Sequence, residues 1–173
     1  MRIEVSGAVL RRLEPADVEQ LYVYRNDPAV VSSLGGFSTG YTKRDLEDWL
    51  EFHRGQRNEV LLCIADPDTD KCLGHVGLYN IDHRVRKAEL AILIGATTRH
   101  GRGLGTSACG ALIDYAHQQL NLRRVELTLL ATNEPAMRLY ERLGFVEEGR
   151  LVDAEYRDGR YVDVICMAHI TAR

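Results

Sequence analysis

Residues 99–105, RHGRGLG, place three glycines within five positions and flank them with cationic side chains. An apolar run, AELAILIG, precedes this stretch, and TSACGALIDYAHQQL, which has the pattern of a helix, follows it. Glycines between a strand and a helix let several backbone N–H groups converge on one anion, and the helix N-terminus adds about half a positive charge. The stretch therefore predicts an anion site, and a pyrophosphate suits such a site better than a carboxylate does.

Two phosphate-binding patterns are absent from this stretch. The dinucleotide-binding pattern GxGxxG needs a glycine where Thr106 stands, and Arg123 and Arg124 occur near the place of its acidic residue, about twenty positions later. The pattern GxxxxGK[ST] of nucleoside triphosphatases is missing as well. These absences argue against a nucleotide-binding enzyme of either of these two kinds. The glycine pattern is short, so a glycine-rich turn without a ligand remains an alternative at this point.

A second stretch, NEPAMRLYERLGF at residues 133–145, follows one strand later. With it, the sequence resembles the GNAT superfamily of acetyl-CoA-dependent N-acetyltransferases. The family pattern Q/R-x-x-G-x-G/A corresponds to residues 100–105, with His100 where the family usually has Gln or Arg, and the pattern N-x-x-A-x-x-L-Y-x-x-x-G-F is complete. The resemblance covers most of the chain and is greatest to the subgroup of ribosomal-protein N-terminal and spermidine acetyltransferases.

The resemblance implies that the anion is the pyrophosphate of acetyl-CoA, which serves as the co-substrate. Backbone amides of the glycine turn would bind it with help from Arg102, and the pantetheine arm would extend the strand at residues 92–94 like an added strand. Asn133 would contact this arm near its thioester end. The residues expected to bind acetyl-CoA are Ile92, Leu93, Ile94, His100, Gly101, Arg102, Gly103, Leu104, Gly105, Thr106, Asn133, Ala136 and Tyr140.

Acetyl transfer to an amine needs a neutral amine, a stabilised carbonyl oxygen and a proton for the departing thiolate. Tyr140 matches the catalytic tyrosine of the family, and a phenol with a pKa near 10 can protonate sulfur without being ionised at rest. Glu89 is the one charge in AELAILI, and partial burial there would raise its pKa and suit it as the base, directly or through water. Glu126 is the alternative base, and a backbone N–H of residues 92–94 would hold the oxyanion. A core tyrosine and a glutamate paired with Arg or Lys are the structural alternatives.

The acceptor site is expected in the N-terminal part, where residues 24–38 and 44–52 correspond to segments that cover the substrate in the family. We predict acceptor contacts from Asn26, Asp27, Phe37, Glu89 and Glu126. This part is acid-rich and would attract a cationic amine, although a solvated helix face is the ordinary explanation of such charges. The sequence indicates a small-molecule or peptide amine and does not separate a polyamine, a protein N-terminus, an aminoglycoside and an amino sugar.

The resemblance implies that an α/β (α+β) fold with the GNAT architecture positions these residues. Such a fold would have a mixed, mostly antiparallel central sheet with helices on both faces, and a splayed parallel strand pair would hold the cofactor. One domain is expected over residues 1–173, and the apolar strand at 87–95 should be buried on both faces. Thr42 with Asp45, and Asn133, should cap helices. Strands are predicted at 8–12, 60–67, 72–82, 87–95 and 123–131 and on both sides of a turn at 157–160, and helices at 15–25, 42–55, 104–120 and 133–144.

Composition excludes several classes of function. The net charge of −3 gives no basic field for nucleic acid, no apolar run reaches the length of a membrane span, and the N-terminus is not a signal peptide. Four cysteines without metal-ligand spacing indicate buried thiols in the reducing cytoplasm, and no metal is expected. A homodimer is possible by analogy with the family. A non-catalytic acyl-CoA-binding regulatory module is the alternative function.

Overall fold

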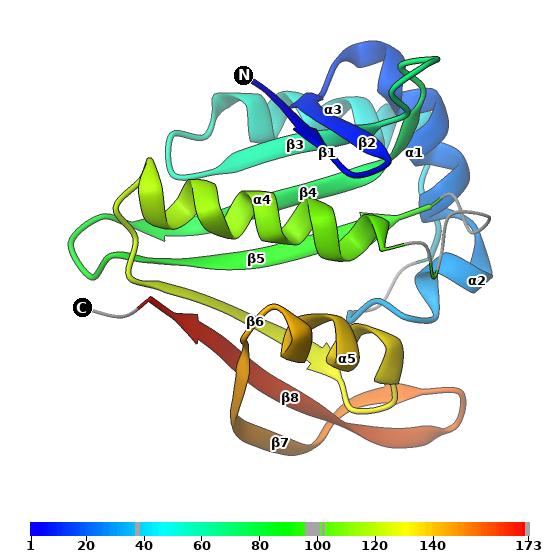
Figure 1. Ribbon diagram of the computed structural model, residues 1–173. Coiled ribbons are helices and arrows are strands. Elements are labelled where there is room, and N and C mark those ends of the chain that lie inside the picture. The colour runs from blue at the N-terminus through cyan, green and yellow to red at the C-terminus, as the bar shows by residue number, and fades with distance from the viewer. Residues whose placement is uncertain (37–38, 96–100, 102, 172–173) are drawn as a thin grey trace.

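In the described part of the chain, one eight-stranded sheet lies at the centre, with helices on both of its faces (Figure 1). The computed structural model describes residues 1–36, 39–95, 101 and 103–171. The strand order is β1-β2-β3-β4-β5-β6-β8-β7, and each neighbouring pair is antiparallel except β5 with β6. This mixed sheet confirms the predicted fold class.

The elements follow the predicted order with two additions. The strands are β1 (Arg2–Val5), β2 (Ala8–Arg12), β3 (Val60–Ala65), β4 (Cys72–Asp82), β5 (Lys87–Ile94), β6 (Arg124–Leu130), β7 (Val146–Arg157) and β8 (Arg160–Ile170). The helices are η1 (Pro15–Asp17), α1 (Val18–Arg25), α2 (Pro28–Val31), α3 (Lys43–Gly55), α4 (Leu104–Gln118) and α5 (Glu134–Arg142). None of these helices combines the length and the apolar character needed to cross a membrane.

The two larger apolar cores lie on opposite faces of the sheet. On one face, Leu112 of α4 packs in the core that also contains Leu62 of β3. On the other face, Leu21 of α1 and Leu50 of α3 pack with Cys63 of β3. Successive residues of β3 thus enter different cores, because side chains alternate between the faces of a strand.

Strand β5 is buried less than its apolar sequence predicted. Leu90 packs in the core beneath α4, whereas Glu89 and Ala91 on the opposite face are exposed. Tyr24 of α1 packs with Leu93 near the end of β5, and residues of β3 and β4 pack with α1 and α3, so Glu89 and Ala91 remain exposed. The prediction of burial on both faces was therefore wrong, and the open face borders the site described below.

Capping contacts confirm two predicted helix starts. Thr42 Oγ1 accepts a hydrogen bond from the Asp45 N–H at 3.2 Å, and Asp45 Oδ2 accepts one from the Thr42 N–H at 2.7 Å. Asn133 Oδ1 accepts one from the Ala136 N–H at 3.2 Å and so caps α5. The sequence did not predict β1, a four-residue strand at the edge of the sheet, or α2, a single turn capped by Asp27.

Candidate functional site

A cleft opens where β5 and β6 separate. The parallel register covers three residue pairs, the last of which joins Glu89 with Glu126, and Figure 1 shows the two strands diverging. Beyond this pair lies a cleft of about 570 Å³. Residues 90–94 of β5, 128–130 of β6, the start of α4 and helix α5 line it. The splayed strand pair that the resemblance implied is present.

The glycine turn supplies backbone groups suited to an anion. Gly101 and Gly103 have φ angles of 74° and 78°, which residues with a side chain rarely adopt. The Ser107 N–H donates to the Gly103 carbonyl at 2.9 Å, so the N–H groups of residues 104–106 precede the first hydrogen bond inside α4. These groups lie at the positive end of the helix. His100 and Arg102 lie outside the described residues.

Gly105 also allows close packing around the cleft. A Cβ atom at this position would lie 2.7 Å from Leu139 Cδ1 of α5 and 3.3 Å from Ile94 Cδ1 of β5. The absence of a side chain therefore lets α4 approach both elements. Its expected role in anion binding and this packing role are compatible, because the Gly105 N–H belongs to the first turn of α4.

Helix α5 forms one wall of the cleft and connects it to the segment after α2. Asn133 Nδ2 donates to the Ser33 carbonyl at 3.0 Å while Asn133 Oδ1 caps the helix. Asn133, Ala136 and Tyr140 all line the cleft, because residues three and four apart share one face of a helix. The same side chain that starts α5 therefore holds a residue of the 33–36 segment.

Tyr140 has the environment of a proton donor. Its side chain is buried, and its ring lies 5.5 Å from that of Phe145, measured between ring centroids. Burial raises the pKa of Tyr140 well above its ordinary value, and the nearby Cys109 thiol raises it further. In the part of the chain that the structure describes, its hydroxyl has no hydrogen-bond partner. A protonated phenol on the cleft wall can donate to a departing thiolate.

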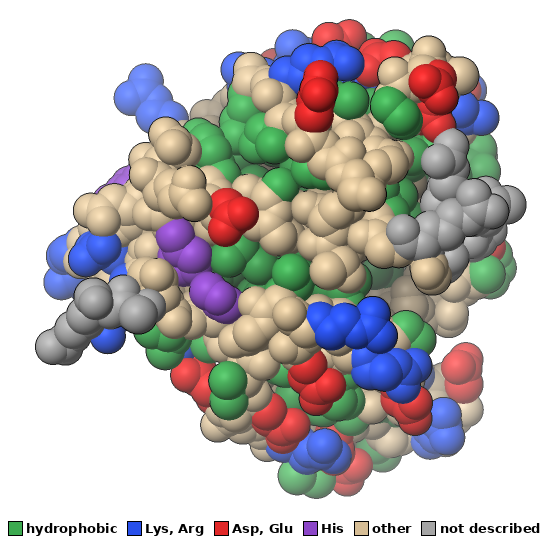
Figure 2. Space-filling view, viewed as in Figure 1, with side chains coloured by type: hydrophobic (Ala, Val, Ile, Leu, Met, Phe, Trp, Pro, Cys, Tyr) green, Lys and Arg blue, Asp and Glu red, His purple; other side chains and the backbone are tan. Residues whose placement is uncertain are grey.

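Positive charge borders the α5 side of the cleft. Arg138 and Arg142 are exposed and line it, and Arg138 pairs with Glu134 at 3.0 Å. Figure 2 shows Lys and Arg side chains gathered over α5. Together with the start of α4, these guanidinium groups favour phosphate groups at this part of the cleft.

A comparison with known families identifies the chain. The family model described as an acetyltransferase (GNAT) domain matches residues 8–146. The chain belongs to the GNAT acetyltransferase family. A putative ribosomal N-acetyltransferase of Bacillus subtilis is 39% identical over 163 residues, covering 90% of this chain and 87% of that protein. A spermidine N(1)-acetyltransferase of Vibrio cholerae is 32% identical over 160 residues, covering 92% and 90%.

Solved structures agree with this assignment. The crystal structure of spermidine N-acetyltransferase from Vibrio cholerae in complex with CoA and spermine matches with a TM-score of 0.84 at 30% identity. The match covers 95% of this chain and 96% of that one. The expected family, fold and enzyme class, an acetyl-CoA-dependent N-acetyltransferase, are thereby confirmed. Every described residue that the resemblance assigned to acetyl-CoA lines the cleft of this acetyltransferase.

Glu89 and Glu126 were expected to act as the base of the acetyltransferase. They form the last residue pair in the register of β5 with β6. Glu89 is exposed and does not line the cleft, so the partial burial predicted for it was wrong. Glu126 accepts hydrogen bonds from Lys87 Nζ at 2.7 Å and Arg124 Nε at 2.5 Å. Burial acts to raise the pKa of Glu126, but these two cations outweigh burial and lower it. The ion pairs therefore disfavour proton uptake by Glu126.

Two of the residues expected to contact the acceptor, Asn26 and Asp27, make hydrogen bonds to nearby backbone groups. The Asn26 side chain donates to the carbonyls of Tyr22 and Tyr41 and accepts from the Tyr41 N–H, and Asp27 caps α2. Neither lines the cleft. Their hydrogen bonds are made to nearby backbone groups, which shape the segment after α1. Phe37 lies outside the described residues.

Sequence reasoning missed the contribution of the β7–β8 hairpin. Arg157 Nη2 donates to the Leu34 carbonyl at 2.6 Å and also to the carbonyl of Gly36. Glu155 lines the cleft, and its Oε1 accepts from the Gly36 N–H at 3.4 Å. The hairpin thereby holds the 33–36 segment beside the cleft. These contacts join distant parts of the sequence, so no local pattern indicates them.

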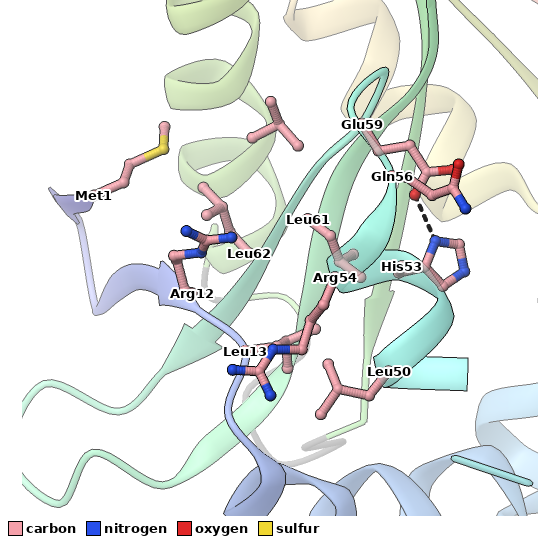
Figure 3. A pocket seen from close by; sticks show the side chains of 11 residues that line it. Met1, Arg12, Leu13, Leu50, His53, Arg54, Gln56, Glu59, Leu61 and Leu62 are labelled. Carbon is pink, nitrogen blue, oxygen red and sulfur yellow. Dashed lines mark hydrogen bonds and ion pairs between the residues drawn. The ribbon is translucent and has the colours of Figure 1, made fainter. Parts of the chain in front are cut away.

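A smaller pocket of about 200 Å³ lies between α3, β2 and β3 (Figure 3). His53 Nδ1 and Glu59 Oε2 lie 2.5 Å apart there, and Arg12 and Arg54 also line it. None of the described residues expected to bind substrates or to act in catalysis lines this pocket.

Three potential metal ligands meet elsewhere, although sequence spacing predicted no such group. Asp17, Cys63 and Cys72 are buried and offer ligand atoms within 4.8 Å of one another. Both carboxylate oxygens of Asp17 accept hydrogen bonds from Arg11, at 2.8 and 2.9 Å. Arg11 therefore neutralises the one carboxylate of this group.

Proposed function

We propose that this acetyltransferase moves the acetyl group of acetyl-CoA to a primary amine of a polyamine. The observation that carries the proposal is the cleft between β5 and β6, with Asn133 and Tyr140 on its wall. The relative from Vibrio cholerae, whose structure holds CoA and spermine, supports this class of acceptor. The four free cysteines support the cytoplasm as its location.

Acetyl-CoA would bind along the cleft from the glycine turn toward Asn133. The turn at Gly101 and Gly103 and the first N–H groups of α4 would hold the pyrophosphate. The amide groups of pantetheine would lie along residues 92–94, where the register of β5 with β6 has already ended. Asn133 and Ala136 would then stand near the thioester end of the arm.

The reaction is a direct transfer between two bound substrates. The neutral amine nitrogen attacks the thioester carbon, and a backbone N–H of residues 92–94 stabilises the oxygen as it gains charge. The C–S bond then breaks with its electron pair on sulfur, and Tyr140 gives its proton to the thiolate. The proton lost by nitrogen passes through water to Glu89, which is exposed at the last paired position of β5. Solvent returns a proton to Tyr140.

A protein N-terminus is the second candidate acceptor. The relative from Bacillus subtilis, a putative ribosomal N-acetyltransferase, favours it at 39% identity. Both acceptors present a primary amine, so the same proton transfers serve either one. The two acceptors differ in the positive charge that is located on their other atoms, at a distance from the reacting nitrogen.

The test is to incubate the protein with acetyl-CoA and a panel of polyamines and ribosomal-protein N-terminal peptides. Mass spectrometry of the mixture should reveal spermidine or spermine heavier by one acetyl group. Acetylated peptides without acetylated polyamines would favour the second candidate. A protein that binds CoA tightly and modifies no amine would contradict both and favour a regulatory acyl-CoA-binding module.

A further inference from the structure

The charges along the cleft are divided between its parts. Among the described residues that line it, Glu155 is the sole carboxylate, and Arg138 and Arg142 are the cationic groups. The arginines belong to α5, whereas Glu155 belongs to β7 and lies beside the 33–36 segment. The cleft therefore has a part suited to phosphate and a separate point suited to a cation.

An irregularity in β7 places Glu155 at this point. Leu151 pairs with Val164, but Glu155 pairs with Val162, so residues 152–154 interrupt the register. Asp153 within this bulge has a φ angle of 53°, and its N–H donates to Asp163 Oδ1 at 3.0 Å. A bulge redirects the side chains that follow it. Glu155 accordingly lines the cleft, although most of β7 is exposed.

The neighbours of Glu155 leave its carboxylate able to bind a cation. Its Oε1 accepts from the Gly36 N–H at 3.4 Å, and its Oε2 lies 3.9 Å from Arg157 Nε. At the second distance the two groups form a long ion pair without a hydrogen bond, while Arg157 Nη2 donates to the carbonyls of Leu34 and Gly36. An ionised carboxylate has about four acceptor sites, so most of them remain for a ligand.

We infer that Glu155 binds a second ammonium group of the acceptor and so selects di- and polyamines over monoamines. This inference rests on the proposed function. The reacting nitrogen must be neutral to attack, so the positive charge that the cleft recognises belongs to another nitrogen of the same acceptor. A monoamine whose single nitrogen is neutral has no such charge, so Glu155 does not stabilise the bound monoamine.

The test compares two acceptors with the same six-carbon chain, 1,6-diaminohexane and hexylamine, in wild-type protein and in Glu155→Gln. The substitution keeps an oxygen for the Gly36 N–H and removes the charge. Glu147→Gln is the matched control, because Glu147 is exposed on the same strand and does not line the cleft. We expect wild type to prefer the diamine in kcat/KM by at least tenfold. Glu155→Gln should remove this preference with an unchanged KM for acetyl-CoA, and the control should keep it.

The outcomes separate this inference from the proposed function. Wild type that acetylates both amines equally, or a variant that loses both activities equally, would overturn the role of Glu155 and leave the acetyltransfer intact. If wild type acetylates neither amine, calorimetric titration of the CoA-loaded protein with each amine decides. If the wild type binds the diamine and Glu155→Gln does not, the cation site is supported although the acetyltransfer is not. Equal binding of the two amines, or no binding of either, would overturn the cation site.

Discussion

Replacing Tyr140 with Phe removes one oxygen atom from the wall of the cleft. The ring is buried against Phe145, and phenylalanine keeps this packing. The hydroxyl has no partner among the described residues, so its loss leaves no other buried group unpaired. We therefore expect the free energy of unfolding to change by less than about 1 kcal/mol.

The rate should change far more than the stability, because CoA must then depart as a thiolate. A thiol has a pKa of about 8.5, so at pH 7 its thiolate is roughly 2 kcal/mol less stable than the protonated form. This difference corresponds to a loss of about 30-fold in kcat. The loss should shrink as the pH rises toward about 8.5, where the thiolate no longer needs a proton. Burial raises the pKa of Tyr140, so the wild-type donor stays protonated over this range.

The assay measures initial rates of acetylated product by mass spectrometry, at saturating acetyl-CoA and acceptor, between pH 6.5 and 8.5. Tyr156→Phe is the control, because Tyr156 is an exposed tyrosine that does not line the cleft. The ratio of wild-type to Tyr140→Phe rates should fall steadily with rising pH. An unchanged rate, or a loss that is the same at every pH, would refute the role of Tyr140 as proton donor.

Three further predictions concern other parts of the molecule. Asn133→Ala removes the cap of α5 and the bond to Ser33, so thermal unfolding should reveal a loss of about 1 kcal/mol, and calorimetry a weaker affinity for acetyl-CoA. Glu89→Gln should lower kcat by about 100-fold without changing the KM for acetyl-CoA, and a retained rate would assign the proton to bulk water. Burial, reinforced by nearby Arg25, lowers the pKa of His75 to about 3. The unfolded chain therefore binds this proton first, and stability should fall by up to about 1.4 kcal/mol per unit as the pH drops from about 6.5 toward 3. Chemical unfolding at stepped pH should yield a shallower slope for His75→Gln, and equal slopes would contradict this source of pH dependence.

The part of the cleft proposed to bind acetyl-CoA could be predicted because its sequence signals are local. The turn at Gly101 and Gly103 and the cap at Asn133 each depend on the conformation of a few adjacent residues. The helical spacing of Asn133, Ala136 and Tyr140 puts these three residues on one face whatever surrounds them. Short-range geometry of this kind can be read from one sequence.

The surroundings of the proposed acceptor site could not be predicted, because they depend on contacts between distant segments. The apolar content of β5 does not reveal that α1 and α3 leave Glu89 uncovered. The charge of Glu126 does not reveal that Lys87 and Arg124 surround it. Both facts depend on how helices and strands pack, which residue types alone do not specify.

The 33–36 segment is held by its main chain. Asn133 contacts the carbonyl of Ser33, and Arg157 contacts those of Leu34 and Gly36. A carbonyl oxygen is present at these positions whichever amino acid the gene encodes. Mutations at Ser33 and Leu34 can therefore alter the lining of the cleft while the contacts from Asn133 and Arg157 persist. Under the proposed function, the fold thus lets the acceptor side of the cleft vary between related sequences without disturbing the side proposed to bind acetyl-CoA.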